Sequence, residues 1–171
     1  MYIRVLEKED AALYQELRLM GLQQCPEAFG SDYDREVRFS LETVIERLQA
    51  VEDQKATVGA FGKDGRLWGI AAVIRMGTVK EQHKANICRV FVHPDARGKG
   101  LARQLMTKLI RLAQGWRGVE QLRLAVNAAN EPARRLYQAL GFQVYGTERE
   151  SLKWNGVYYD EELMVLRLAK A

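Results

Sequence analysis

The sequence is poor in the residues from which metal sites and disulfide frameworks are built. Its 171 residues include two cysteines, Cys25 and Cys88, and two histidines, His83 and His93. Two cysteines cannot form a disulfide framework for a chain of this size, and they lack the Cys-x-x-Cys spacing of a zinc site. We therefore expect no metal and a protein that stays reduced.

The sequence also lacks a long apolar segment. Its first residues become charged after five positions, unlike a signal peptide, and no run approaches the roughly 18 apolar residues of a membrane helix. We expect a cytoplasmic protein with no membrane partner. Proline is scarce, and no repeat or low-complexity tract interrupts the chain, so we expect residues 1–171 to form a single domain.

Basic residues outnumber acidic ones only slightly. The 26 Lys and Arg residues against 22 Asp and Glu give a net charge of +4. Nucleic-acid binding usually needs a basic stripe, so we expect no nucleic-acid partner. However, residues 89–103 hold four basic side chains and one acid, whereas residues 27–36 hold four acids and one base. The first segment suits phosphates, and the second suggests a cationic ligand.

Along the chain, segments with the hydrophobic pattern of a strand alternate with segments that have the pattern of a helix. This alternation predicts an α/β fold. A helical spacing predicts helices, and β-rich runs bounded by turn residues predict strands. The order predicts a mixed, mostly antiparallel sheet with one central parallel pair, covered by helices, and a loop over 23–40. Asn155-Gly156 is a strong hairpin signal between the last two strands. The predicted helices are 11–20, 41–50, 101–115 and 131–140, and the predicted strands are 2–6, 56–61, 67–74, 86–92, 121–126, 143–153 and 157–168.

The most informative segment is the Gly-rich loop between the strand over 86–92 and the helix over 101–115. Gly98 and Gly100 let the backbone approach a ligand, and the first amides of the next helix have no partner within it. These amides, the helix dipole and nearby basic side chains predict an anion site. The loop lacks the Ser or Thr of a P-loop and the third glycine of a dinucleotide fingerprint. Its basic side chains are Arg97, Lys99 and Arg103.

Two motifs resemble those of the Gcn5-related N-acetyltransferase (GNAT) family. Its acetyl-CoA signature, [Q/R]-x-x-G-x-[G/A], is met by Arg97, Gly100 and Ala102. Residues 130–142 resemble its N-x-x-A-x-x-L-Y-x-x-x-G-F segment. The motifs follow in the family's order, and the resemblance covers nearly the whole chain. The matching residues of the second motif are Asn130, Ala133, Leu136, Tyr137, Gly141 and Phe142.

The resemblance implies the GNAT acyl-CoA N-acyltransferase fold with acetyl-CoA as co-substrate and no metal. It implies that acetyl-CoA lies where the two central parallel strands splay apart. Backbone amides of the Gly-rich loop would hold the pyrophosphate, and the strand before this loop would hold the pantetheine arm. The residues so implied for cofactor binding are Val90, Val92, Arg97, Gly98, Lys99, Gly100, Leu101, Ala102, Asn130 and Tyr137.

The resemblance also implies acetyl transfer by direct attack of a primary amine on the thioester, with two catalytic residues. The Val92 amide would donate to the thioester oxygen as it becomes an oxyanion, an interaction typically worth about 3–4 kcal/mol. Tyr137 matches the family's general acid, because a phenol of pKa about 10 can protonate a thiolate whose thiol has a pKa of about 8.5. Many relatives carry a Glu base on the preceding strand, where this sequence has residues 86–89, Asn-Ile-Cys-Arg. The base stays open among Glu27, Asp32, Asp34, Glu81, His83 and a water chain.

In the family, the loop after the first helix and the terminal hairpin wall the acceptor site. The acids of this loop predict a cationic acceptor, such as a polyamine, an aminoglycoside-like compound or a basic peptide terminus. The alternatives are a protein N-terminal or lysine acetyltransferase and, from another class, a non-catalytic CoA-binding sensor. Monomer and homodimer are both open. The residues expected to contact the acceptor are Glu27, Phe29, Asp32 and Tyr159.

Each of these features also has a purely structural interpretation. Gly98 and Gly100 could form a tight turn, and Tyr137 could be a core residue on an apolar helix face. The acidic loop could be a solvated surface, and Tyr159 could pack across the terminal hairpin. The structure is needed to decide among these interpretations.

Overall fold

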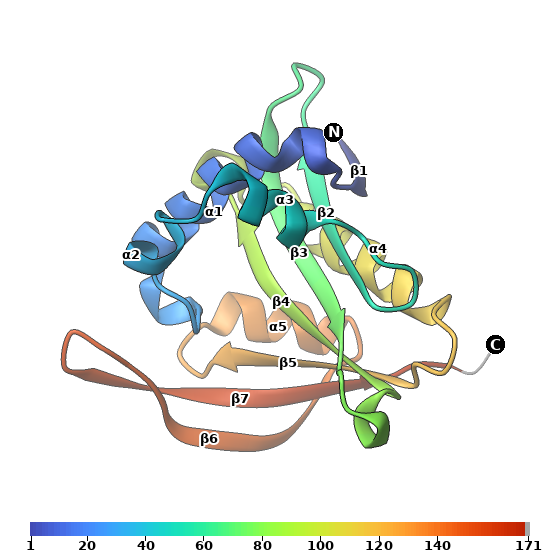
Figure 1. The fold of residues 1–171 in the computed structure, drawn as a ribbon. Helices are drawn as coiled ribbons and strands as arrows, with labels where there is room; N and C mark the ends of the chain where they lie inside the picture. Colours follow the sequence, from blue (N-terminus) through green and yellow to red (C-terminus); the bar gives the residue numbers. More distant parts are fainter. Residues whose placement is uncertain (170–171) are drawn as a thin grey trace.

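Seven strands of the chain form one sheet in the order β1-β2-β3-β4-β5-β7-β6. The computed structural model describes residues 1–169, and Figure 1 shows how the strands are arranged. Neighbouring strands are antiparallel except β4 and β5, which are parallel. The predicted mixed sheet with one central parallel pair is confirmed. The strands are β1 (Tyr2–Val5), β2 (Lys55–Phe61), β3 (Leu67–Arg75), β4 (Lys84–Val92), β5 (Gln121–Asn127), β6 (Gln143–Trp154) and β7 (Val157–Arg167).

Helices cover both faces of this sheet. α1 (Ala11–Gln24) and α3 (Leu41–Leu48) pack on one face, and α4 (Leu101–Gln114) packs on the other (Figure 1). No helix within residues 1–169 is long and apolar enough to cross a membrane. The shorter elements are α2 (Tyr33–Glu36), α5 (Glu131–Ala139) and the 3-10 turns η1 (Lys8–Asp10), η2 (Pro26–Ala28), η3 (Val79–Glu81) and η4 (Pro94–Ala96).

The core consists of two apolar clusters, one on each face of the sheet, because side chains alternate along every strand. On the α4 side, Leu105 and Leu109 are completely buried against β2, β3 and β4. On the other side, Tyr14 of α1 and Leu48 of α3 belong to one cluster with Phe91 of β4. Burial of each such side chain contributes about 1.5–3 kcal/mol. β4 is therefore held in place from both faces.

The segment over residues 23–40 is more ordered than a loop. α1 continues past Gly21, which allows a close approach of the Phe91 ring, since a Cβ there would lie 3.0 Å from the ring. The segment also contains α2, whose N-cap Asp32 accepts a hydrogen bond from the Arg35 amide at 2.9 Å. The prediction of a plain loop was wrong, because a helix of one turn is too short to show a periodic apolar pattern.

β4 and β5 are paired over only a small part of their length. The parallel register joins three residue pairs and ends at Asn86 and Arg123. Beyond this point β4 stays paired with β3 and β5 stays paired with β7, so the two strands separate. A bulge adds to the divergence: the β3–β4 register shifts between Ile70 and Ala72, and Arg89 has a φ of 57°. Such bulges bend a strand and re-aim its side chains.

Candidate active site

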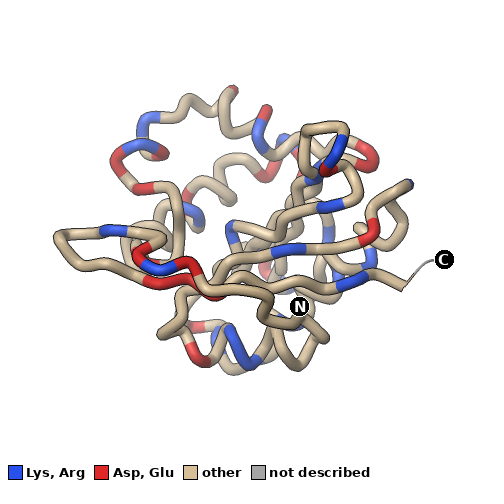
Figure 2. The backbone as a smooth tube through the Cα atoms, turned by 90° about the horizontal axis from the view of Figure 1, so that it is seen from below, with Lys and Arg blue, Asp and Glu red and all other residues tan. Residues whose placement is uncertain are grey.

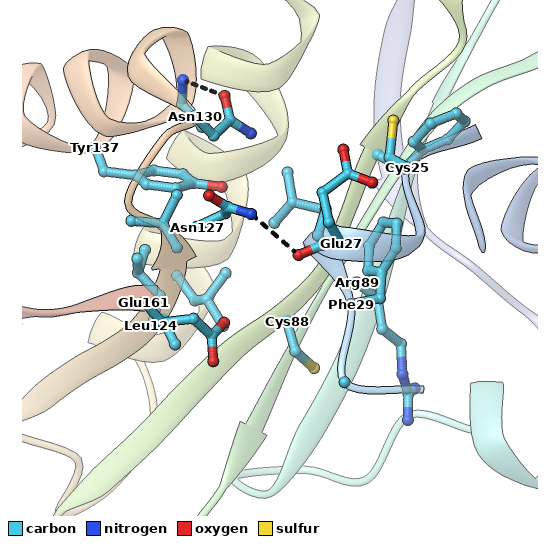
Figure 3. A pocket seen from close by; sticks show the side chains of 18 of the residues that line it. Cys25, Glu27, Phe29, Cys88, Arg89, Leu124, Asn127, Asn130, Tyr137 and Glu161 are labelled. Carbon is cyan, nitrogen blue, oxygen red and sulfur yellow. Dashed lines mark hydrogen bonds between the residues drawn. The ribbon is translucent and has the colours of Figure 1, made fainter. Parts of the chain in front are cut away.

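A cavity of about 1280 Å³ opens where β4 and β5 separate. Its walls come from elements far apart in the sequence, among them α1, η2, β4, β5, α5 and β7. In Figure 3, Tyr137, Asn127 and Glu161 line it from α5, β5 and β7, whereas Glu27 and Cys88 line it from η2 and β4. A crevice where neighbouring strands of an α/β sheet part is a usual place for a ligand.

The edge of β4 that faces the cavity carries backbone groups without strand partners. The His93 amide donates to Trp68 O at 2.8 Å, toward β3. Successive amides of a strand point to opposite edges, so the amides of Val92 and Val90 point to the β5 side, where pairing has ended. Arg97 Nε donates to Val92 O at 3.2 Å. This edge can therefore hydrogen-bond an extended ligand as it would an added strand.

The Gly-rich loop leads β4 into α4 and leaves the start of α4 without a side-chain cap. Gly98 and Gly100 have φ values of 73° and 74°, and nothing lies within 4 Å of a Cβ built on either. Gly100 is the N-cap of α4, and the amide of Gln104 is the first to bond back, to Gly100 O at 3.1 Å. The amides before Gln104 and the helix dipole therefore form an anion-binding surface.

Most residues predicted to bind the cofactor meet at this end of the cavity. Ala102, in the first turn of α4, lines the cavity and joins it to the anion-binding surface. Gly98, Lys99 and Gly100 are exposed outside the lining, and Leu101 is buried beneath the loop. The predicted cofactor residues that line the cavity are Val90, Val92, Arg97, Ala102, Asn130 and Tyr137.

Tyr137 lies on α5 and presents its hydroxyl to the cavity. Asn130 begins this helix as its N-cap and accepts a hydrogen bond from the Ala133 amide at 3.2 Å. The Tyr137 ring is 7% exposed and packs edge-on against Phe142, with 6.1 Å between ring centroids. Burial raises the pKa of Tyr137 to about 12. In Figure 3 the hydroxyl points toward Asn127, so a neutral hydrogen-bond donor faces the cavity at physiological pH.

The residues predicted to contact the acceptor fall into two groups. Glu27, Phe29 and Tyr159 line the cavity. Asp32 lies outside the lining, and its carboxylate serves as the N-cap of α2. Among the side chains considered for the base, Glu27 lines the cavity. Those outside the lining are Asp32, Asp34, Glu81 and His83.

The acidic character expected for residues 27–36 is weakened because Glu36 is buried in an ion pair. Its carboxylate accepts hydrogen bonds from Arg18 Nε at 3.0 Å and Nη2 at 2.9 Å, and Arg47 Nη2 lies 3.6 Å away. Burial opposes the charged form, but the hydrogen bonds and charge of Arg18, with the charge of Arg47, lower the pKa of Glu36 to about 2. One of the four acids counted in residues 27–36 is therefore neutralised inside the protein and adds nothing to a surface charge.

Two polar residues of the cavity, Asn127 at the end of β5 and Glu161 within β7, were not among the predicted site residues. Asn127 Nδ2 donates to Glu27 O at 3.4 Å, and Asn127 Oδ1 accepts from the Ala129 amide at 2.9 Å, so Asn127 ties η2 to β5 (Figure 3). Glu161 pairs with Asn127 in the β5–β7 register and lines the cavity. Asn at a strand end is a turn signal, but nothing in the sequence showed which loop it would contact.

The three consecutive acids of β7 differ in their surroundings. Asp160 is paired with Arg149 at 2.7 Å, and Glu162 is paired with Arg134 at 2.6 Å. Figure 2 shows red and blue positions close together along the β6–β7 hairpin. Glu161, between them, accepts from the Ser151 hydroxyl and lines the cavity. Its charge is thus the one of the three that acts inside the cavity.

The structure also brings together arginines that no motif contains. Arg18 of α1, Arg47 of α3 and Arg89 of β4 all line the cavity near Cys88. Burial raises the pKa of the Cys88 thiol, although these arginines lower it, so Cys88 stays a neutral thiol. Within residues 1–169, no three His, Cys, Asp or Glu side chains are grouped so that they could hold a metal ion.

A sheet that splays at its one parallel pair, beside an uncapped helix after a Gly-rich loop, defines the class of N-acyltransferases that the sequence resembles. The Acetyltransferase (GNAT) family matches residues 21–142. The chain belongs to this family of acyltransferases.

Named relatives and a solved structure agree with this assignment. An uncharacterized N-acetyltransferase of Mycobacterium tuberculosis (strain ATCC 25618 / H37Rv) is 30% identical over 115 residues, which cover 67% of this chain and 69% of that protein. The L-amino acid N-acetyltransferase AaaT of Escherichia coli (strain K12) is 32% identical over 68 residues, 40% of this chain and 42% of that protein. The structure of yncA from Salmonella typhimurium with its cofactor acetyl-CoA has a TM-score of 0.82 at 23% identity and covers 100% of this chain and 95% of that chain. This last likeness concerns the fold.

Proposed function

We propose that this protein transfers the acetyl group of acetyl-CoA to a primary amine. The observation that carries the proposal is the free edge of β4, where the amides of Val90 and Val92 face a cavity that continues into the start of α4. In the reaction an amide N–C bond forms and the thioester C–S bond breaks. The ammonium group of the acceptor loses two of its three protons: one goes through a base to solvent and one ends on the departing thiolate.

The cavity fits the two chemically different parts of acetyl-CoA. The pantetheine arm carries amides that can pair with the β4 edge, and the phosphates match the amides from Gly98 to Arg103 and the side chain of Lys99. The left-handed glycines leave open space above the loop, where a side chain would obstruct a phosphate. When bound, acetyl-CoA supplies the reactive thioester. We assign the Val92 amide to donate to the thioester oxygen and the backbone of Val90 to pair with the pantetheine arm.

Tyr137 is assigned as the proton donor to the leaving thiolate. Its pKa of about 12 lies well above the ordinary thiol value of about 8.5, which makes proton transfer unfavourable if the thiolate behaves as in water. The same cavity raises the pKa of the Cys88 thiol, so a CoA thiolate held there should also become more basic. The phenol of Tyr137 then donates a hydrogen bond to the departing thiolate and afterwards transfers its proton to it.

Two carboxylates can accept the proton of the attacking ammonium. Glu27 of η2 and Glu161 of β7 line the cavity on either side of Asn127, whose Nδ2 bonds to Glu27 O. Residues 86–89 of β4 contain no glutamate, although many relatives carry one on this strand, so this chain needs a carboxylate from another element. We assign the role of base to this pair, acting directly or through a water molecule.

The acceptor is a small-molecule amine or a peptide amine. The name of AaaT, an L-amino acid N-acetyltransferase, supports a small α-amine. A strongly cationic acceptor, expected from residues 27–36, is less well supported because Glu36 is neutralised and Asp32 lies outside the lining. The carboxylates of Glu27 and Glu161 suffice for one ammonium group.

The replacement Tyr137→Phe tests the enzyme against a CoA-binding sensor. Loss of a general acid should lower kcat by about 10²–10⁴-fold, while the affinity for CoA changes less than about twofold. Tyr158→Phe, at an exposed position of β7, is the matched control and should keep the wild-type rate. The measurement is thiol release from acetyl-CoA with a mixed pool of amines and peptides. CoA binding without acetylated product from any acceptor would favour the sensor.

A further inference from the structure

Two arginines share one buried carboxylate beside the cavity, and a third arginine lines the cavity without contacting that carboxylate. Arg18 and Arg47 both contact Glu36, at 2.9 and 3.6 Å. Arg89 lies on β4 at the bulge and lines the same cavity. Buried charges are normally paired, because an unpaired one is costly to remove from water. One carboxylate cannot neutralise three guanidinium groups, so the local charge is positive.

Arg89 is the arginine with the fewest partners of the three. Among residues 1–169, no side-chain hydrogen bond or ion pair is formed by its guanidinium, whereas Arg18 is bonded twice to Glu36. Arg47 stacks on the Phe39 ring at 4.6 Å. Burial, followed by the positive charge of Arg89, lowers the pKa of Arg47. A second anion between Arg47 and Arg89 would offset the effect of this positive charge.

An independent observation comes from Arg18, which is 3% exposed. Its Nη1 is buried and has no hydrogen-bond partner among the described residues, although its Nε and Nη2 are both bonded. The side chain lines the cavity and lies over the Phe29 ring at 4.7 Å. A buried N–H of a charged group without an acceptor is rare in folded proteins. This N–H therefore lacks an acceptor oxygen among the described residues.

The opposite wall of the cavity carries a negative charge. Glu161 lies there with Asn127, across from Cys88 and Arg89, whereas Glu27 lies on the side of Cys25 and Phe29 (Figure 3). An ammonium group held by these carboxylates and an anionic group held by the arginines describe a zwitterion. The phosphates of CoA are accounted for elsewhere, at the start of α4.

We propose that the acceptor carries a carboxylate near its reactive amine, as a free amino acid does, and that Arg47 and Arg89 bind this carboxylate with Arg18 behind them. The inference rests on the proposed acetyl transfer and specifies its substrate class. It excludes peptide N-termini and polyamines as preferred acceptors, because their reactive amine has no adjacent carboxylate. Planar guanidinium groups are well suited to hold a carboxylate by paired hydrogen bonds.

The test compares amino acids with their own α-carboxamides, which differ only at the carboxylate. Wild-type enzyme should use the acids with a kcat/KM about 10- to 100-fold higher, the usual value of a hydrogen-bonded charge. Arg89→Gln should remove most of this preference by raising KM for the acids, with little effect on the carboxamides. Arg89→Lys should restore part of it. Arg38→Gln, at an exposed position outside the lining, is the control and should keep the preference.

Binding of reaction products separates failure of this inference from failure of the proposed function. N-acetyl amino acids and their carboxamides are titrated with CoA present into wild type, Arg89→Gln and Arg47→Gln, after circular dichroism has shown that each variant is folded. Tighter binding of the acids that depends on Arg89 supports the carboxylate site even without turnover. Acetylation of carboxamides or diamines as efficiently as of acids, unchanged in Arg89→Gln, overturns the site while the acetyltransferase function stands.

Discussion

The two ends of the cavity are made from different parts of the chain. The end that we assign to the cofactor is one continuous segment, residues 90–102, whose binding groups are mainly backbone amides. The end that we assign to the acceptor is made of side chains from α1, α3, β4, η2 and β7. Backbone groups tolerate changes of side chain, provided that the glycines keep the loop in shape. The acceptor end instead depends on individual charges that neutralise one another.

The largest effect is expected at Glu36, on which the acceptor end depends. Glu36→Gln leaves the buried Arg18 and the half-buried Arg47 without their counter-ion, and breaking a buried pair such as Arg18–Glu36 costs about 3–5 kcal/mol. The measurement is urea unfolding at neutral pH. Glu42→Gln, at an exposed position in the first turn of α3, is the control and should change stability by less than about 0.5 kcal/mol.

The pH dependence of stability provides a second measure of the same ion pair. Folding lowers the pKa of Glu36 from 4.5 to about 2, so its contribution is fully present above pH 4.5 and is lost as the pH falls through 2. The shift corresponds to about 3 kcal/mol. When the pH falls from 4.5 to 2, the free energy of unfolding should decrease less for Glu36→Gln than for the wild-type protein. Equal acid sensitivity of the two proteins would contradict the pairing.

The shape of the cofactor end is tested by Gly100→Ala. A left-handed φ costs a residue with a side chain about 1–2 kcal/mol, and here the side chain also enters the space given to a phosphate. We expect about tenfold weaker binding of CoA by calorimetry. Gly115→Ala is the control, because Gly115 has a φ of −79° at the other end of α4. Equal loss of affinity in both variants would show that the effect comes from the helix as a whole.

The smallest effect is expected at Asn127, which lies between the two ends. Asn127→Ala removes the hydrogen bonds to Glu27 O and from the Ala129 amide, and stability should fall by about 1 kcal/mol. KM for the acceptor should rise a few fold, since Glu27 loses its anchor, while CoA affinity stays the same. Gln138→Ala, exposed on α5, is the control for thermal unfolding and kinetics. If Asn127→Ala changed only the affinity for CoA, Asn127 would belong to the cofactor end of the cavity, and its assigned role in holding Glu27 would be contradicted.

The difference between a cofactor end built from one continuous segment and an acceptor end built from distant side chains decides how much could be predicted from the sequence. The Gly-rich loop, the caps Ser40 and Asn130 and the Asn155-Gly156 hairpin are local signals, and the fold and the cofactor end follow from them. The Arg18–Glu36 pair joins residues eighteen positions apart, and the Asn127–Glu27 bond joins residues one hundred positions apart. Such pairs have no local pattern, because packing of helices against the sheet creates them. The charge of residues 27–36 was therefore overestimated.

The sheet has two parts, strands β1–β4 and strands β5–β7, and the short register between β4 and β5 joins them by three residue pairs. On the α4 face, one apolar cluster contains both Ile87 of β4 and Leu122 of β5 and so spans the two parts. On the α1 face, the cluster around Phe91 contains no residue of β5 within the described chain. The two parts of the sheet are therefore joined by apolar packing on the α4 face and by the Asn127–Glu27 hydrogen bond on the α1 face. A wider cavity on the α1 face, where the arginines lie, would cost this hydrogen bond and leave the packing of α4 intact.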